Sequence, residues 1–185
     1  MTMHVLTNGV IELAPADVSL ARAVRDYYMR NKAFLAPFDP VRNDYFYTVS
    51  YQYASLEADM KLADEDRGYR FYIRPCNEPD RVIGCIALSN IVRGAFQSCH
   101  LGYKLDEAYI NRGYMTMAVK LIVDFAFHEI GLHRIEGNIM PGNVRSRRFV
   151  EKCGFVCEGI SEKYLKINGV WEDHVHMVIL NDEMA

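Results

Sequence analysis

The stretch 111-NRGYMT-116 places an arginine and a glycine directly before a run of residues with helical spacing. Glycine at this point has two interpretations. It eases a tight turn between a strand and a helix. It also leaves the backbone N–H groups of the first helical turn free to bind a phosphate at the positive end of the helix dipole. The segment alone favours the plain turn, because glycine before a helix is common.

A second polar pair, Asn143 and Ser146, follows the turn made by Pro141 and Gly142. Asparagine after Pro-Gly is a natural helix N-cap, and a serine three residues later lies in the first helical turn. A hydroxyl at that place is near the positive end of the helix dipole, which favours a departing anion such as a thiolate. The pair therefore has both a structural and a chemical interpretation.

His100, His174 and His176 are among the histidines in segments with strand character. Imidazole, with a reference pKa of about 6.5, can accept a proton near neutral pH. A lone histidine on a strand is more often structural, and Trp171 and Tyr164 favour a packing role for the last two. The sequence offers no third ligand beside them, so we do not predict a metal site.

The cysteines are five in number, irregularly spaced and without a C-x-x-C pair. Reduced thiols in a cytoplasmic protein are the simplest interpretation, and we expect no metal. The positions are Cys76, Cys85, Cys99, Cys153 and Cys157.

Hydrophobic periodicity and turn residues predict the elements that must position these groups. The expected strands are Val10–Leu13, Tyr69–Arg74, Arg81–Ile91, Ser98–Leu105, His133–Met140, Phe155–Lys166 and Val170–Leu180. The expected helices contain Leu20–Tyr28, Thr48 to about Asp66, Ala118–Ala126 and Asn143–Lys152. The prolines of 34-FLAPFDP-40 interrupt the first helical region, and Asn168-Gly169 indicates a final hairpin.

These elements predict a mixed α/β fold, with about seven strands in a mostly antiparallel sheet and about four helices. A helix connects the fourth and fifth strands, so those two should run parallel. A helix N-terminus at the carboxyl end of a parallel pair is where α/β proteins bind phosphorylated ligands.

The length of 185 residues predicts a single domain, residues 1–185. Half of the residues are hydrophobic and the net charge is -3. We therefore expect no direct nucleic-acid binding, since such proteins usually carry a basic face. The sequence contains no long apolar run and its first residues do not resemble a signal peptide, which predicts a cytoplasmic protein without a membrane span.

Three motifs in order carry a resemblance to a known family: 111-NRGYMT-116, 133-HRIEGNIMPGNVRSRRFVEKCGF-155 and 167-INGVWEDHV-175. Together they resemble the GNAT superfamily of acyl-CoA-dependent N-acetyltransferases, and more narrowly its RimJ/RimL-type branch. The stretches 88-LSNIVRGAFQSCHLGYKL-105 and 25-RDYYMRNKAFLAPFDPVR-42 are similar to the RimJ type. The resemblance covers about Arg25 to Val175.

The resemblance implies a GNAT-like fold that binds acetyl-CoA. In that family the turn before the helix follows the pattern Gln/Arg-x-x-Gly-x-Gly/Ala and wraps the cofactor pyrophosphate. Gly113 keeps the central glycine, whereas Ile110 and Met115 depart from the pattern. The implied cofactor-binding residues are Leu101, Gly102, Tyr103, Asn111, Arg112, Gly113, Tyr114, Met115, Thr116, Asn143 and Ser146.

The same resemblance implies direct acetyl transfer in a ternary complex, with Ser146 as the acid that protonates the cofactor sulfur. Many relatives place a glutamate where His100 stands, so we predict His100 as the candidate base. Phe34, Phe38 and His174 are the expected acceptor-binding residues, because loops over the end of a sheet form such clefts.

The missing carboxylate bears on the acceptor. Deprotonation at pH 7 costs about 1.4 kcal/mol for an α-amine but about 4.6 kcal/mol for lysine. A weak base manages the first more easily, which favours a protein N-terminus, and the RimJ-type resemblance implies a small-subunit ribosomal protein that begins with alanine. We expect a monomer or a homodimer.

Two other functions stay open. The first is acetylation of a small amine, such as an antibiotic or a polyamine, which would differ only in the acceptor cleft. The second is a non-catalytic acyl-CoA-binding module, which the departures at Ile110 and Met115 and the missing glutamate allow.

Overall fold

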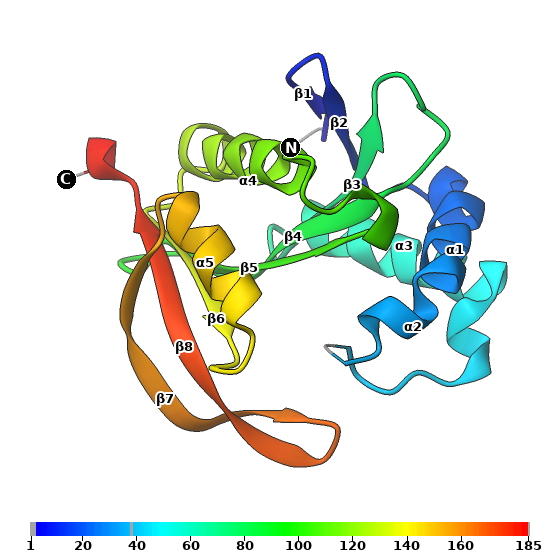
Figure 1. Ribbon diagram of the computed structural model, residues 1–185. Helices are drawn as coiled ribbons and strands as arrows, with labels where there is room; N and C mark the ends of the chain where they lie inside the picture. Colours follow the sequence, from blue (N-terminus) through cyan, green and yellow to red (C-terminus); the bar gives the residue numbers. More distant parts are fainter. Residues whose placement is uncertain (1–2, 38, 185) are drawn as a thin grey trace.

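The computed structural model describes residues 3–37 and 39–184, and this part of the chain forms an eight-stranded mixed sheet with helices on both faces (Figure 1). The strand order is β1-β2-β3-β4-β5-β6-β8-β7. The strands are β1 (Leu6–Thr7), β2 (Ile11–Pro15), β3 (Tyr69–Pro75), β4 (Gly84–Val92), β5 (Ser98–Leu105), β6 (Arg134–Ile139), β7 (Val156–Ile167) and β8 (Val170–Leu180). The α-helices are α1 (Ala21–Arg30), α2 (Lys32–Leu35), α3 (Val49–Asp64), α4 (Tyr114–Asp124) and α5 (Val144–Lys152).

The two faces of the sheet carry separate apolar clusters, because side chains alternate along each strand. Tyr72 and Cys85 pack with α1 and α3, whereas their neighbours Phe71 and Ile86 pack with α4 and α5. Figure 1 shows α1 and α3 on the opposite side of β3 and β4 from α4. We call the first side the α1/α3 face and the second the α4/α5 face.

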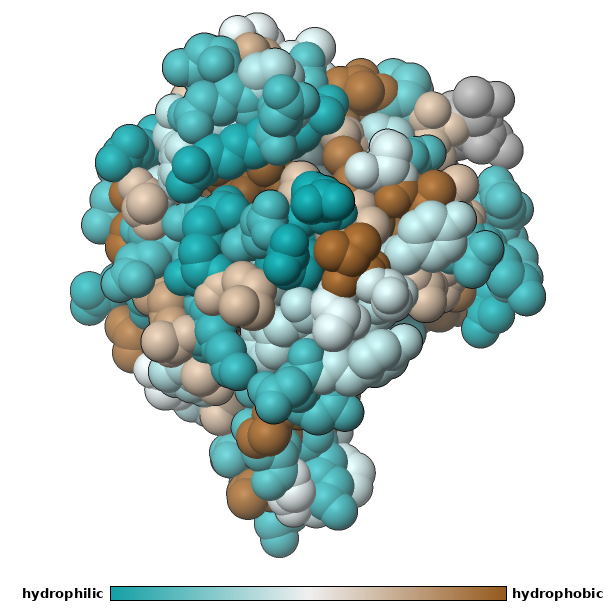
Figure 2. Space-filling view, turned by 90° about the vertical axis from the view of Figure 1, so that its right-hand side faces the viewer, coloured by the Kyte–Doolittle hydropathy of each residue, from teal (hydrophilic) through white to brown (hydrophobic). Residues whose placement is uncertain are grey.

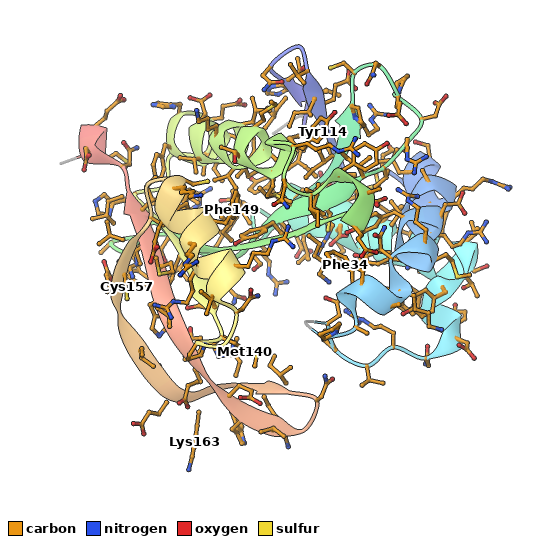
Figure 3. All side chains as sticks on the ribbon, viewed as in Figure 1. Phe34, Tyr114, Met140, Phe149, Cys157 and Lys163 are labelled. Atoms are coloured by element: carbon orange, nitrogen blue, oxygen red, sulfur yellow. The ribbon has the colours of Figure 1, made fainter. Side chains whose placement is uncertain are left out.

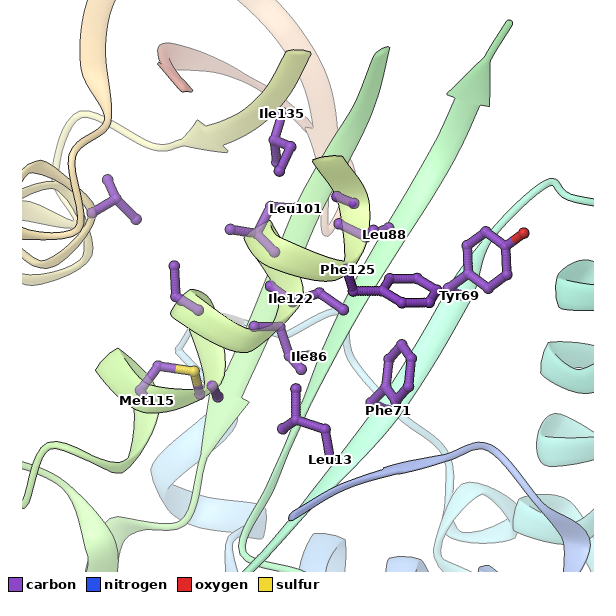
Figure 4. Packing of buried hydrophobic residues seen from close by; sticks show 14 of the residues in the cluster. Leu13, Tyr69, Phe71, Ile86, Leu88, Leu101, Met115, Ile122, Phe125 and Ile135 are labelled. Atoms are coloured by element: carbon purple, nitrogen blue, oxygen red, sulfur yellow. The ribbon is translucent and has the colours of Figure 1, made fainter. Parts of the chain in front are cut away.

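Helix α4 and the turn after it are held on the sheet by apolar residues at helical spacing, and Ala118, Ile122 and Phe125 are fully buried. Figure 4 shows Ile122 and Phe125 packed against the strands. The Phe125 ring, in the π-helical turn Phe125–Glu129 that follows α4, lies 5.3 Å from the rings of both Tyr69 and Phe71. These edge-to-face contacts add to the burial of apolar area. The packing fixes the start of α4 relative to β5.

The parallel pair is confirmed, but it is short. Among the described residues, the register of β5 with β6 runs from Ser98 opposite Arg134 to His100 opposite Glu136. Beyond this point β5 continues with β4, and β6 continues with β8. The sheet therefore opens between residues 101–105 of β5 and 137–139 of β6.

Most predicted boundaries agree with the structure, and Ser98–Leu105 and Val170–Leu180 agree to the residue. Three details differ. The strand expected from Arg81 begins at Gly84, since Arg81 N–H closes a turn on the Glu78 carbonyl. Strand β1 was not expected, because two residues show no alternation. The additional short helix α2 stands before the first proline of 34-FLAPFDP-40.

Helices with enough length and apolar character to cross a bilayer do not occur in the described part of the chain.

Gly84 tests the close approach of β4 to β5. A Cβ at this position would lie 2.5 Å from the Lys104 carbonyl oxygen, so backbone must shift to admit it. We expect Gly84→Ala to lower the free energy of unfolding by about 1–3 kcal/mol in urea denaturation. Gly137→Ala is the matched control, because its nearest contact is 3.8 Å. Equal stability of the two variants would contradict the close approach.

Candidate active site

The N-terminus of α4 is built to receive an anion. Gly113 has a φ of +82° and Asn111 a φ of +60°, so the backbone turns sharply before the helix. The first intrahelical bond runs from Met117 N–H to the Gly113 carbonyl, at 3.1 Å, which leaves the amides of residues 114–116 outside the helical ladder. Within the described residues, no side chain caps this end. The amides and the helix dipole thus present positive potential.

Side chains do not block this turn. The Met115 side chain is 8% exposed and points into the core beneath α4, so its size leaves the turn open (Figure 4). Tyr114 stands with its ring centroid 5.7 Å from that of Tyr109, and the exposed Arg112 guanidinium lies 5.5 Å from the same Tyr109 ring. Arg112 therefore adds a positive charge beside the N-terminus of α4.

The three residues of β5 that were predicted to bind the cofactor, Leu101, Gly102 and Tyr103, alternate between the two faces of the sheet. Leu101 is buried on the α4/α5 face, whereas a Cβ at Gly102 would meet no described atom within 4 Å. Because β6 has already diverged, the backbone of this part of β5 borders the opening in the sheet. A ligand can therefore lie along β5 as another strand would.

Tyr103 and Ser146 form a hydroxyl pair on the α4/α5 face. Their oxygens are 2.6 Å apart, and either can be the donor. The Asn143 side chain accepts a hydrogen bond of 3.1 Å from Ser146 N–H, which confirms Asn143 as the N-cap of α5. Burial raises the pKa of Tyr103 to about 12, so its hydroxyl stays protonated at neutral pH. Phe149, one helical turn after Ser146, packs edge-on against Tyr103, with ring centroids 5.3 Å apart (Figure 3).

His100 lies on the α1/α3 face, at the point where β5 and β6 separate. Its Nδ1 is 3.1 Å from the Asn90 amide, and its Nε2 is 3.8 Å from Glu136 Oε1. Burial lowers the pKa of His100, with the positive charge of Arg134 contributing, so the imidazole is neutral at pH 7. A neutral imidazole at this place can accept a proton.

Glu136 is the acid that sequence reasoning missed. Its side chain is 14% exposed and accepts hydrogen bonds from Arg134 at 2.8 Å and from His176 Nδ1 at 2.9 Å. Burial alone would raise the pKa of Glu136, but these hydrogen bonds outweigh it and hold the pKa below the usual value. The position opposite His100 follows from the parallel register, which one sequence does not reveal.

The predicted acceptor residues lie on different parts of the α1/α3 face. His174 is 4% exposed, and its ring lies 5.7 Å from that of Tyr164. Phe34 is half-buried on α2 and packs against the α1/α3 cluster (Figure 3). The prediction for Phe38 lies outside the described residues.

Two long-range contacts tie the loop after α2 to the sheet and to the hairpin. Lys104 of β5 forms an ion pair of 2.6 Å with the buried Asp39. The Asn168 side chain, at the tip of the β7–β8 hairpin, accepts a hydrogen bond of 2.8 Å from Val41 N–H. The far end of this hairpin projects below the body of the molecule (Figure 2). Loop and hairpin thus meet in front of the α1/α3 face of β5.

A cleft of about 350 Å³ opens on the same face, between α3 and the strands β3 and β4. Its lining includes Asp59, Arg67, Arg70 and Asn90, so its charge is mixed. Asn90 joins this cleft to His100. In the described residues, no group of three or more His, Cys, Asp or Glu side chains is placed to hold a metal ion.

The site therefore has a pair of hydroxyl groups and a neutral imidazole on opposite sides of the opening between β5 and β6, which we call the seam. The Tyr103–Ser146 hydroxyls lie on one face, and His100 lies on the other. A reacting group in the seam would be reached from both sides, which suits transfer of an acyl group between two bound molecules.

Comparison with known proteins shows the family to which this fold belongs. Residues 13–156 match the acetyltransferase (GNAT) domain family. The chain belongs to the GNAT acetyltransferase family, and the departures at Ile110 and Met115 are variations within it. The mixed sheet and its parallel pair are those of GNAT acetyltransferases of known structure.

Within the family, the chain is similar to ribosomal-protein N-acetyltransferases of the RimJ/RimL type. It is 42% identical to a probable N-acetyltransferase, YjcK, of Bacillus subtilis over 96% of this chain and 98% of the relative. It is 35% identical to the ribosomal protein uS5-alanine N-acetyltransferase of Escherichia coli, over 81% and 77%. The ribosomal-protein-S5-alanine acetyltransferase of Vibrio fischeri superposes with a TM-score of 0.90 at 33% identity, over 99% and 100% of the chains.

The Asn143 cap tests how Ser146 is positioned. We expect Asn143→Ala to lower the free energy of unfolding by about 1 kcal/mol, because the Ser146 amide loses its acceptor. Asn143→Asp, which keeps an acceptor oxygen, should retain most of the stability. Chemical denaturation of both variants measures the difference, and an unchanged Asn143→Ala variant would argue against the cap.

Proposed function

We propose that this protein transfers the acetyl group of acetyl-CoA to the N-terminal α-amine of a protein, by direct attack in a ternary complex. The observation that carries the proposal is the seam between β5 and β6, with the Tyr103–Ser146 hydroxyls on one side and neutral His100 on the other. The proposed setting is the cytoplasm.

The residues of the α4 N-terminus fit the phosphates of the donor. The amides of residues 114–116 would bind the pyrophosphate, with Arg112 as a cation beside them. The backbone of Leu101, Gly102 and Tyr103 would bind the pantetheine arm along the open side of β5. Structural neighbours that share the fold have been solved with coenzyme A or acetyl-CoA, which supports this assignment.

Two residues would move protons. Bound acetyl-CoA supplies the activated acetyl thioester. Ser146, held by its N-cap and paired with protonated Tyr103, would protonate the departing sulfur. His100, kept neutral by burial, would accept a proton from the attacking amine.

The acceptor is inferred from the names of relatives and from the charge of the cleft. The relatives in Escherichia coli and Vibrio fischeri are named for alanine acetylation of a ribosomal protein. The cleft beside His100 carries Arg67 and Arg70 as well as Asp59, which disfavours a polyamine. We therefore propose a ribosomal protein N-terminus that begins with alanine.

A panel of acceptors tests this assignment. Acetyl-CoA consumption should be confined to peptides with a free α-amine and should be fastest with alanine-first ribosomal sequences. The same peptides with a blocked N-terminus and an internal lysine are the control, and spermidine tests the small-amine alternative. Turnover with spermidine or the lysine peptides alone would overturn the proposal.

The Ser146→Ala variant tests the acid. We expect kcat to fall about 10²-fold or more, within the range typical of general acid catalysis, while the affinity for acetyl-CoA is retained. Binding is measured by calorimetry and turnover by release of free thiol. Unchanged kcat would remove Ser146 from the mechanism, and lost binding would show a role in holding the donor.

A further inference from the structure

The proposed function assigns His100 as the base that takes the amine proton, but it names no group that stabilises the protonated imidazole. On its own, His100 is a weak candidate for the base, because burial and the positive charge of Arg134 disfavour the protonated imidazole. When the amine nitrogen bonds to the acetyl carbon and the C–S bond breaks, the electron pair leaves with sulfur. The amine gives up a proton to His100, and Ser146 returns one to sulfur. An imidazolium on His100 therefore needs a negative charge beside it.

Glu136 provides that charge from the neighbouring strand. It is the register partner of His100 at the last paired position of β5 and β6, so both side chains stand on the α1/α3 face. His100 Nε2 and Glu136 Oε1 are 3.8 Å apart. That distance gives electrostatic attraction without a direct hydrogen bond, so Nε2 is left able to accept the amine proton.

The other ring nitrogen is occupied. His100 Nδ1 lies 3.1 Å from Asn90 Nδ2, and rotation of the Asn90 amide by half a turn would bring Oδ1 to that place instead. With the amide oxygen turned toward the ring, Nδ1 carries the hydrogen and Nε2 keeps its lone pair. In this tautomer His100 accepts a proton on the side that faces Glu136.

Glu136 is held in place from two further strands. His176 Nδ1 of β8 donates to Oε1 at 2.9 Å, and His176 Nε2 lies 2.7 Å from the Ser161 hydroxyl of β7. Arg134 binds Oε2 at 2.8 Å and also pairs with Glu158 at 2.7 Å. The hydrogen bonds that fix Glu136 keep it ionised, and the Tyr164 ring packs edge-on against His176 at 4.8 Å.

We propose that Glu136 is the positioning residue of the acceptor site: it stabilises protonated His100 across the parallel strand pair, and His176 and Arg134 aim its carboxylate. The inference rests on the proposed function, in which His100 is the base. Position 100 lacks the glutamate that many relatives carry. The register of β5 and β6 brings Glu136 of the neighbouring strand to the same place. The charged and titratable groups that face His100 are Glu136 and Arg134 of β6 and His176 of β8.

The test compares Glu136→Gln with the matched carboxylate variant Glu158→Gln. Glu158 shares Arg134 with Glu136, but among the described residues it forms no hydrogen bond with His176. For Glu136→Gln we expect kcat with an alanine-first peptide to fall about 10-fold or more at pH 7. The acid limb of the kcat profile should also move to lower pH, because His100 loses the neighbour that favours its protonation. Glu158→Gln should leave both unchanged.

A readout independent of turnover follows the imidazoles directly. NMR titration of the His100 ring should show a lower pKa in Glu136→Gln than in the wild type or in Glu158→Gln. Glu136→Asp, which keeps the charge on a shorter side chain, should recover part of the rate and of the titration shift. Thermal unfolding with and without acetyl-CoA establishes that each variant folds and binds the donor.

The outcomes separate the two proposals. If the wild type acetylates the peptide and Glu136→Gln loses rate with no shift of the acid limb or of the His100 titration, Glu136 is only structural and this inference fails while the proposed function stands. An unchanged rate in Glu136→Gln has the same meaning. If the wild type acetylates no amine, the proposed function fails, and an unshifted His100 titration would then also remove the coupling to Glu136.

Discussion

The site depends on one constraint, which is that the parallel pairing of β5 with β6 ends at His100 and Glu136. A parallel pair between two antiparallel halves of a sheet would normally bury its hydrogen-bonding groups along its whole length. Here each strand turns to its other neighbour, so one side of residues 101–105 borders an opening. The packing of α4 and α5 on the same face keeps the two halves of the sheet together, although the parallel pairing between them is short.

The seam also divides the chemistry between two faces. Because side chains alternate along β5, His100 and Tyr103 must point in opposite directions. Tyr103 meets the hydroxyl of Ser146 in a mostly buried place, and His100 faces Glu136 where β5 and β6 separate. The hydroxyl pair and the imidazole are thereby kept on separate faces of the sheet.

The α1/α3 face of β5 is joined to the loop after α2 and to the final hairpin by contacts between distant parts of the chain. Asp39 is nearly buried by its ion pair with Lys104, and Asn168 fastens the hairpin tip to the backbone at Val41. Removing one partner of such a partly buried ion pair lowers the stability of the protein, because the other charge is left uncompensated. The loop that carries Asp39 is therefore held by β5, the strand that also carries His100.

Several features could be predicted from the amino-acid sequence alone: seven of the strands, the N-cap made by Asn143 and the glycine turn before α4. They follow from residues close in the chain, whose periodicity and turn chemistry act locally, and the helix between β5 and β6 predicts that these two strands run parallel. Three contacts became visible only in the folded chain: Glu136 faces His100, Tyr103 meets Ser146 and Asp39 binds Lys104. Those partners are 36, 43 and 65 residues apart. Their pairing depends on strand register and helix packing, and a shift of one residue would turn each side chain to the other face.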